Sequence, residues 1–283
     1  MIDKIILKLI RITGVTLICS LWLQGCGETP TSQLSEQFPI IRSGPYGMEF
    51  AFIPKGTFRM GSPKDEDRRY SNETRHWVKL TDDYWMQTTE VTMGQWRKVM
   101  GSYPDTDDRC RNSDSTRKGD TYPAVCINMD DMDLFIKKLN DLERNSGYRY
   151  RLPTEAQWEY ATRAYTETPF SLDQPLELFS WYYSSSDGHA HPVGKLKANF
   201  FGLYDVHGNV SEPVTDWYAE YPETKSYADA VVNPEFSTVS TNRVWRGGAW
   251  LTYAWGCRSA FREGDSVPLR RNDFGFRLMR MKI

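Results

Sequence analysis

The sequence has no excess of charge of either sign. Its 35 lysine and arginine residues face 37 aspartate and glutamate residues, which gives a formal net charge of −2. Binding of nucleic acid depends on clustered basic residues that neutralise phosphates. A charge balance of this kind therefore gives no electrostatic case for a nucleic-acid partner. With 25% charged and 40% hydrophobic residues, the composition is ordinary for a soluble globular protein.

Long hydrophobic runs are also missing, and the one clear apolar run lies close to the N-terminus. Lys4, Lys8 and Arg11 precede the run Ile12 to Leu23, which is too short for a comfortable membrane span. A basic start and a short apolar core are typical of a secretory signal. The ending Leu-Gln-Gly-Cys resembles a bacterial lipoprotein signal, with Cys26 as the lipidated first residue. An uncleaved N-terminal anchor is the alternative, and it would leave the protein in the same compartment.

These features predict three parts: a signal peptide over residues 1–25, a flexible tether over 26–45 and one domain over 46–283. The predicted tether is rich in Ser, Thr, Pro, Gly and Glu, as flexible linkers are. Loss of the signal would leave a mature charge of −4. Gly27 stands where an aspartate would favour retention in the inner membrane. We therefore expect a lipid-anchored protein of the bacterial cell envelope, in the outer membrane rather than the inner.

Cysteine is scarce, and two of the five cysteines lie in or next to the signal. Cys110 and Cys126 bracket a polar loop, and we expect a disulfide between them, which exported proteins can keep. A loop of this size would gain on the order of 3 kcal/mol from such a bond. Cys257 is then left over, either as a buried small apolar residue or as a reactive thiol.

Regular elements are predicted mainly in the first part of the domain. Alternating or β-rich runs predict strands at 48–53, 58–60 and 77–80, and capping boxes or one-sided apolar faces predict helices at 92–100, 130–142 and 154–164. From Trp181 onward we expect short strands and long loops. Ten Trp, sixteen Tyr and thirteen Phe then supply large rigid side chains that bury much area at little rotamer cost.

Five motifs in order resemble the formylglycine-generating enzyme (sulfatase-modifying factor) family. They are Phe52 to Gly61, Glu90 to Gln95, Arg151 to Tyr160, Phe201 to Val210, and the closing segment Arg243 to Arg277. Each motif is weak alone, but five in this order cover nearly the whole domain. The resemblance implies an α+β fold, a loop-rich formylglycine-generating-enzyme-type variant of the C-type lectin fold.

The resemblance also implies a structural calcium ion in the stretch Gly202 to Glu212. Calcium takes carboxylate oxygens and backbone carbonyls. By position in the family motif, Asp205 and Glu212 would give side-chain oxygens, and Gly208 and Val210 would give carbonyls. The alternative is a purely structural turn without an ion.

The family's oxidases hold copper with two cysteines, and this chain lacks that pair. The two positions correspond to Ala254 and Ser259, and only Cys257 lies nearby. One thiol cannot reproduce a site with two soft sulfur ligands. We therefore expect no copper and no formylglycine-generating activity.

The closing segment has a second resemblance, to terminal regions that retroelements diversify in some bacterial and phage proteins of this fold. The shared scaffold includes Arg246 to Trp250, Cys257, Pro268 and Gly275 to Arg277. Trp and Glu at 255 and 263 do not arise from adenine-directed change of asparagine codons, which counts against the simplest form of diversification.

These observations predict a cell-envelope protein that binds an unknown protein or glycan through a surface built by residues 251–274. The expected contact residues are three aromatic anchors and three charged neighbours: Tyr253, Trp255, Phe261, Glu263, Asp265 and Arg270. One alternative buries the aromatic residues as core. The other is a periplasmic maturation enzyme of the same family, for which the sequence names no catalytic residues.

Overall fold

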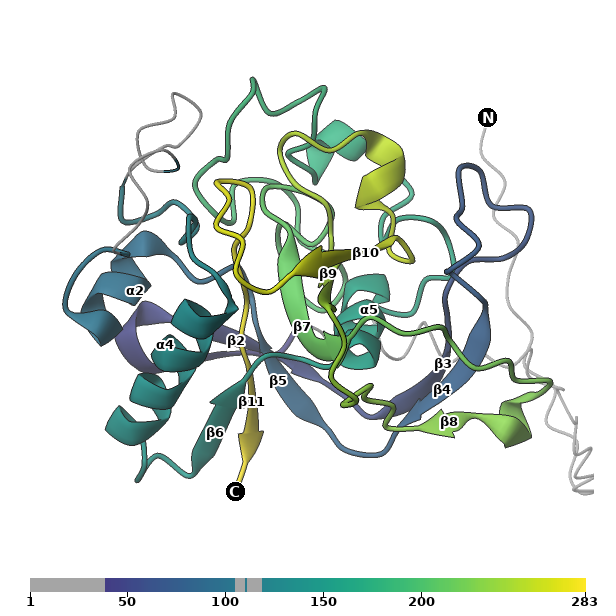
Figure 1. The fold of residues 1–283 in the computed structure, drawn as a ribbon, viewed down its shortest axis with the longest axis horizontal. Helices are drawn as coiled ribbons and strands as arrows, with labels where there is room; N and C mark the ends of the chain where they lie inside the picture. The colour runs from purple at the N-terminus through teal and green to yellow at the C-terminus, as the bar shows by residue number, and fades with distance from the viewer. Residues whose placement is uncertain (1–38, 105–109, 111–118) are drawn as a thin grey trace, which may run out of the picture. The chain divides into compact units, whose positions relative to one another are not determined.

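The computed structural model describes residues 39–104, 110 and 119–283. By its contacts the chain divides into residues 1–37 and a second unit, Phe38–Ile283. The predicted signal and the lipidation site Cys26 lie outside the described residues. Within these, three α-helices and eleven strands form a mixed fold (Figure 1), so the predicted α+β class is confirmed.

The largest sheet has five strands in the order β1 (Ile41–Ser43), β2 (Glu49–Ile53), β5 (Tyr84–Gln87), β11 (Met279–Lys282) and β6 (Tyr148–Arg151). All neighbours in it are antiparallel. The last strand, β11, lies between β5 and β6 (Figure 1), so the C-terminal segment is anchored inside a sheet.

Two smaller sheets complete the strand content of the described residues. One has the order β10 (Arg262–Ser266), β9 (Asn242–Arg246) and β7 (Glu212–Trp217). The other has the order β3 (Gly56–Met60), β4 (His76–Leu80) and β8 (Val231–Val232), with β8 parallel to β4. The remaining turns include the 3₁₀ helices η1 (Pro45–Gly47), η2 (Leu176–Leu178), η3 (Tyr227–Asp229) and η4 (Ala254–Cys257).

The three helices begin where the sequence predicted. Capping boxes open α2 (Met93–Met100) and α5 (Glu155–Arg163), through Thr92 with Gln95 and Thr154 with Gln157. A third box opens α4 (Met129–Leu142). The rings of Trp96 on α2 and Phe135 on α4 stack with their centroids 5.1 Å apart. Among the described residues, no helix is both long and apolar enough to cross a membrane.

The predicted tether ends too late in the sequence. Strand β1 lies within residues 26–45 and pairs with β2, with Ile41 opposite Ala51. The Gly and Pro residues that suggested a linker form the turn between these strands, where the Gly44 amide donates to the Met48 carbonyl at 2.8 Å. The folded domain therefore begins by residue 41 rather than at residue 46, because turn residues and linker residues share one composition.

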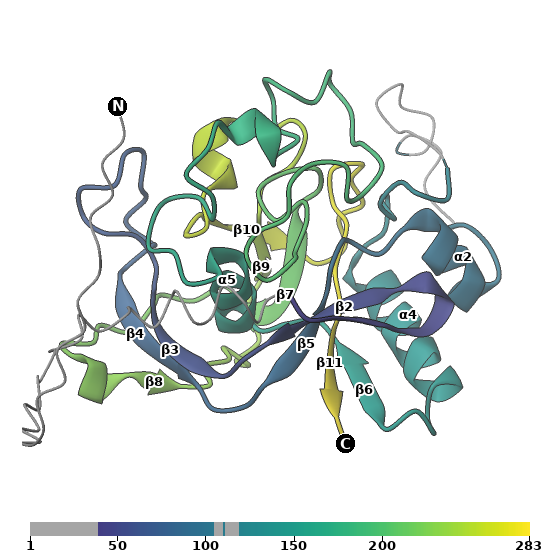
Figure 2. The ribbon, with the colours of Figure 1, turned by 180° about the vertical axis from the view of Figure 1, so that it is seen from behind.

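Helix α5 lies between the sheets and is buried on nearly all sides (Figures 1 and 2). Two of its buried side chains are carboxylates, which must be paired to stay charged away from water. Glu155 accepts both Nε and Nη2 of Arg262, at 2.8 and 2.6 Å. Glu159 accepts the Nε of Arg163 at 2.8 Å and also bonds Arg246.

This buried network joins α5 to the C-terminal sheet, because Arg246 ends β9 and Arg262 begins β10. Burial by itself raises the pKa of Glu159, but the charges of Arg163 and Arg246 outweigh it, so the net shift is downward. The carboxylate therefore stays ionised as the partner of two guanidinium groups.

Replacing Glu159 with alanine should lower the free energy of unfolding by about 3–5 kcal/mol, because two buried arginines lose their partner. Urea titration of the purified chain measures the change. The matched control is Glu167→Ala, which breaks the pair with Arg75 but removes a side chain that is 62% exposed. That control should change the free energy by less than about 1 kcal/mol. Equal effects of the two variants would show that the buried network does not stabilise the fold.

Candidate functional site: an aromatic face on the C-terminal segment

The predicted ligand-binding segment folds back over the domain through the short helix η4. Tyr253 is 53% exposed, whereas Cys257, at the other end of η4, is fully buried. Trp255 and Phe261 are both partly exposed. The three predicted aromatic anchors therefore remain at the surface, and the alternative that buries them as core is wrong.

These three rings lie side by side with two more that come from distant parts of the chain. The ring centroids of Tyr253 and Trp255 lie 6.4 Å apart, and their planes are inclined by 16°. The ring centroids of Trp255 and Phe261 lie 5.7 Å apart. Tyr70 lies 5.8 Å from both Trp255 and Phe261. Tyr183 lies 4.6 Å from Tyr253. We call these five residues the aromatic face.

Sequence reasoning missed Tyr70 and Tyr183. Tyr70 lies in the loop between β3 and β4, which its many charges marked as a solvated segment. The available signal was a large aromatic residue inside a charged loop. In the structure the Tyr70 side chain is 47% exposed. Tyr183 gave no comparable signal, because its place beside Tyr253 depends on the hydrogen bond from its amide to the Thr252 carbonyl at 2.9 Å.

Beneath the aromatic face, Arg258 joins the C-terminal segment to the loop between β3 and β4. Its guanidinium bonds both oxygens of Glu73, at 2.7 and 2.8 Å, and Glu66 at 2.5 Å. All three side chains are buried. Tyr70 is therefore held beside Trp255 by ion pairs on either side of it in the loop, so the rings are pre-arranged rather than free to separate.

The buried side chain of His207 hydrogen-bonds the backbone at the end of η4. The Ser171 amide donates to Nε2 of His207 at 3.1 Å, so Nε2 has no proton and Nδ1 donates to the Cys257 carbonyl at 2.8 Å. Burial lowers the pKa of His207 from 6.5 to about 4. The ring is neutral at neutral pH and is fixed in one tautomer, with both nitrogens bonded to backbone groups.

Cys257 resolves the alternative left open by the sequence in favour of burial. It is the one free cysteine within the described residues, and it is fully buried. Burial raises the pKa of its thiol, so the reactive thiolate is not populated at neutral pH. Ala254 and Ser259 are the positions at which the family resemblance predicts the two cysteines; Ala254 begins η4 and Ser259 is buried.

The three predicted charged neighbours do not form one group with the aromatic face. Glu263 and Asp265 lie on β10, and Asp265 pairs with Arg271 at 3.5 Å. Arg270 instead forms an ion pair with Asp131 at the start of α4. Arg270 is therefore engaged by the scaffold, through a partner from a helix far away in the sequence, and its role as a contact residue stays a prediction.

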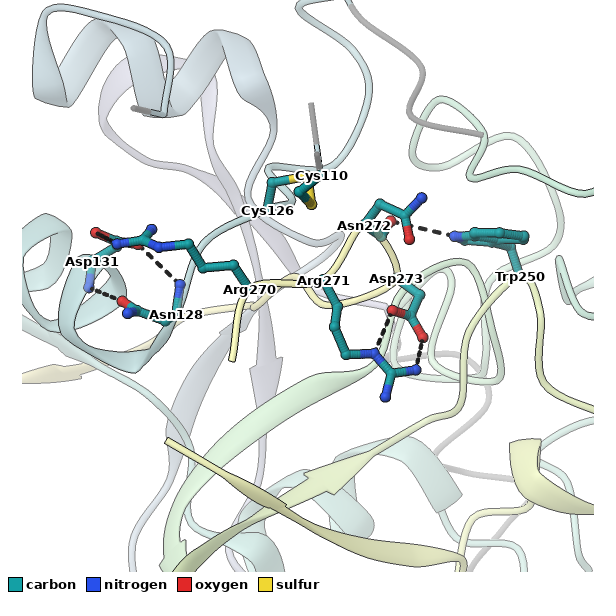
Figure 3. The surroundings of a disulfide bond; sticks show 9 residues. All are labelled: Cys110, Cys126, Asn128, Asp131, Trp250, Arg270, Arg271, Asn272 and Asp273. Carbon is teal, nitrogen blue, oxygen red and sulfur yellow. Dashed lines mark hydrogen bonds and ion pairs between the residues drawn. A yellow bond between two sulfur atoms is a disulfide. The ribbon is translucent and has the colours of Figure 1, made fainter. Parts of the chain in front are cut away.

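The predicted disulfide between Cys110 and Cys126 is present, with Cα atoms 5.8 Å apart (Figure 3). The Cys126 amide donates to the Arg271 carbonyl at 2.9 Å. The cross-link therefore lies against the segment after β10, beside the two arginines of that segment (Figure 3). It joins Cys110 to the same framework that carries the C-terminal segment.

Two of the four predicted calcium ligands, Asp205 and Glu212, are carboxylates, and both accept hydrogen bonds from protein donors. Both oxygens of Glu212 are taken up by Arg277 and the Trp158 indole, at 2.7–2.9 Å. Asp205 accepts the Gly194 amide at 2.7 Å, and burial raises its pKa to about 6. The part of the chain that the structure describes contains no group of three or more His, Cys, Asp or Glu side chains arranged for a metal.

Gly208 and Val210 are buried in the same loop, between Asp205 and Glu212. Glu212 as found here does not fit a calcium ligand, because protein donors already satisfy its carboxylate. A calcium ion at this loop stays a prediction. Sequence reasoning missed Glu90, a fully buried carboxyl that accepts the side-chain amide of Asn209 at 3.1 Å. Burial and the neighbouring Asp205 raise the pKa of Glu90.

Acid should weaken the support under the aromatic face through His207. Its folded pKa, about 4, is below the unfolded value of 6.5, so its contribution to stability is complete above 6.5 and is lost as the pH falls towards 4. The difference in free energy of unfolding between wild type and His207→Asn should therefore shrink by about 3 kcal/mol from pH 7 to pH 4. Urea titrations at several pH values measure it, and a difference that does not change with pH would contradict the assignment.

Comparison with known proteins agrees with this architecture. Residues 42–282 match the family described as sulfatase-modifying factor enzyme 1-like domain. The formylglycine-generating enzyme of Streptomyces coelicolor is 26% identical over 271 residues, which are 89% of this chain and 81% of that protein. The chaperone protein LppX of Paenibacillus barcinonensis is 29% identical over 235 residues, covering 68% of this chain and 76% of that protein.

Two solved structures are also similar. Treponema denticola variable protein 1 has a TM-score of 0.72 and 25% identity, covering 86% of this chain and 99% of that one. PvdO from Pseudomonas aeruginosa has a TM-score of 0.73 and 26% identity, covering 87% and 99%.

Proposed function

This chain belongs to the sulfatase-modifying factor family, and we propose that it uses the family fold to bind a ligand through the aromatic face rather than to oxidise a cysteine. The observation that carries the proposal is the cluster of five partly exposed rings held on a buried ionic framework. Large surface rings with fixed positions lose little entropy on binding, and aromatic residues are enriched at binding hot spots. The similarity to a variable protein of this fold supports the same reading.

The ligand class follows from the face itself. Its five rings offer flat apolar surfaces and hydroxyl groups at the edges, which suit a protein side-chain cluster or the faces of sugar rings. None of the five rings carries a positive charge that would attract phosphate groups, and the whole chain has a formal net charge of −2. A polyanion such as nucleic acid is therefore disfavoured as the partner.

The double change Tyr253→Ala and Trp255→Ala should weaken binding of the ligand by at least about tenfold, as expected when hot-spot rings are removed. Glycan arrays and immobilised surface proteins screened with the full chain identify ligands, and titration then compares wild type with the variant. The matched control is Tyr103→Ala, which removes an equally exposed ring (48%) close to the end of α2. Retained affinity in the double variant, or loss of its fold, would contradict the proposal.

We also propose that a lipid on Cys26 anchors the domain in the bacterial cell envelope, in the outer membrane rather than the inner. The diacyl or triacyl group of a bacterial lipoprotein supplies the second chain that stable attachment needs. A surface-held binding domain and a lipid anchor are compatible, since the anchor precedes the folded domain by some fifteen residues.

Changing Cys26 to serine should abolish metabolic labelling with an alkyne fatty acid and move the chain from the detergent-extracted membrane fraction to the aqueous fraction. Cys19→Ser is the matched control and should leave both properties unchanged, because it lies within the apolar run of the signal. A Cys26→Ser protein that is still labelled and membrane-bound would refute the lipid anchor.

A periplasmic maturation enzyme is the second candidate, and the similarity to PvdO favours it. Oxidation of the formylglycine type is not proposed, because Ala254 and Ser259 stand where the family resemblance places the two thiols. The two candidates differ in one observable property. An enzyme leaves a chemically changed product after incubation, whereas a binding protein returns its ligand unchanged.

A further inference from the structure

A hollow beside the loop between β3 and β4 is lined mainly by basic side chains and side chains with hydroxyl groups. Its volume is about 550 Å³. Four of its ten lining residues are basic, namely Arg59, Lys64, Arg69 and Arg75. Glu223 is the one acidic lining residue. The surface is therefore strongly cationic in a protein whose total charge is close to zero.

The basic groups of this hollow are only partly satisfied by the protein: the Arg75 guanidinium pairs with Glu167, whose side chain is 62% exposed. The Nε atoms of Arg59 and Arg75 are buried and have no hydrogen-bond partner among the described residues. The guanidinium of Arg59 lies over the Trp77 ring, 5.3 Å from the ring centroid. A buried donor without a partner is unfavourable, so these atoms indicate an acceptor that the protein does not supply.

Hydroxyl groups lie among the basic side chains. Ser62, Ser71, Thr74 and Thr224 line the hollow together with the arginines. The Arg69 Nε donates to the Ser62 hydroxyl at 3.1 Å, which fixes the guanidinium at the wall. The Ser62 hydroxyl is taken up by Glu73, to which it donates at 2.7 Å. Planar guanidinium groups and the other three hydroxyls together suit an oxyanion with several acceptor oxygens.

A second hollow, of about 430 Å³, adjoins the first and shares Arg59 as a lining residue. Its walls carry the rings of Phe58, Trp77, Tyr160, Tyr165 and Tyr227. A ligand whose anionic group lies at Arg59 can therefore place an organic ring over these aromatic side chains.

From this arrangement we infer that the two hollows form a binding site for a phosphate or sulfate ester of a ring-bearing molecule such as a sugar. The basic hollow holds the tetrahedral oxyanion and the aromatic hollow holds the ring. This site is separate from the aromatic face: Tyr70 contributes to that face, while its neighbours Arg69 and Ser71 line the basic hollow. The inference does not depend on the ligand of the aromatic face.

Isothermal titration of the full-length chain tests the site, with sodium phosphate, sodium sulfate and glucose 6-phosphate at constant ionic strength. Chloride and free glucose serve as reference solutes. We expect saturable binding of the tetrahedral anions, tightest for the sugar ester. Lys64→Gln and Arg69→Gln should each weaken it at least tenfold, and Glu223→Gln should strengthen it severalfold. Vesicles of phosphatidylglycerol against phosphatidylcholine show whether a lipid headgroup is the source of the phosphate.

Lys79→Gln is the matched control, because Lys79 is an exposed residue of β4 that does not line either hollow. It should leave affinity within twofold of wild type. Lys64 is also exposed, so its variant keeps the fold and reports on the site alone. Absence of saturable binding by every tetrahedral anion, or equal losses in Lys64→Gln and Lys79→Gln, would overturn the inference. Loss of the aromatic face by Tyr253→Ala and Trp255→Ala should leave anion binding unchanged.

Discussion

Pairing of buried arginines with buried glutamates is the interaction on which the rest of this structure depends. Helix α5 places Glu155 and Glu159 inside the domain, and the C-terminal sheet supplies Arg246 and Arg262 as their partners. Each charge alone would be strongly unfavourable in the interior, so the helix and the sheet are stable only together. Such pairs are directional, and they fix the register of β9 and β10 against α5 as apolar contacts by themselves would not.

The same kind of pairing recurs at other buried positions. Arg258 joins η4 to Glu66 and Glu73 in the loop between β3 and β4, and Arg277 joins the end of the chain to Glu212. A long segment with little regular structure is thus held at several points by charge-assisted bonds. Because these buried bonds hold the segment, its exposed side chains are not needed to stabilise the fold. Recognition residues are commonly carried in this way by loops on a rigid scaffold.

The loop between β3 and β4 contributes residues to two surfaces with different chemistry. The aromatic face includes Tyr70, whereas Arg69 and Ser71 turn to the basic hollow. The sulfatase-modifying factor fold of this chain therefore provides one rigid framework for both surfaces. The comparisons support the fold and the family, and the proposed functions rest on these two surfaces.

Local features of the structure could be read from the sequence with good accuracy. Capping boxes at Thr92 and Thr154 identified two helix starts, since the signal lies within four consecutive residues. The disulfide between Cys110 and Cys126 and the exposure of Tyr253, Trp255 and Phe261 were also expected from the sequence. The tether was drawn too long, because the turn after β1 has the composition of a linker.

What the sequence by itself determined is therefore the family, the fold class and the elements whose signals are local. Tertiary structure alone decided the partners of the charged residues: Arg270 turned to Asp131, and Glu212 turned to Arg277. It alone brought Tyr70 and Tyr183 to the aromatic face and gathered Arg59, Arg69 and Arg75 around one hollow. The physical reason is that a charge or a ring can pair with many others in a chain, and only the packed fold selects which one lies within reach.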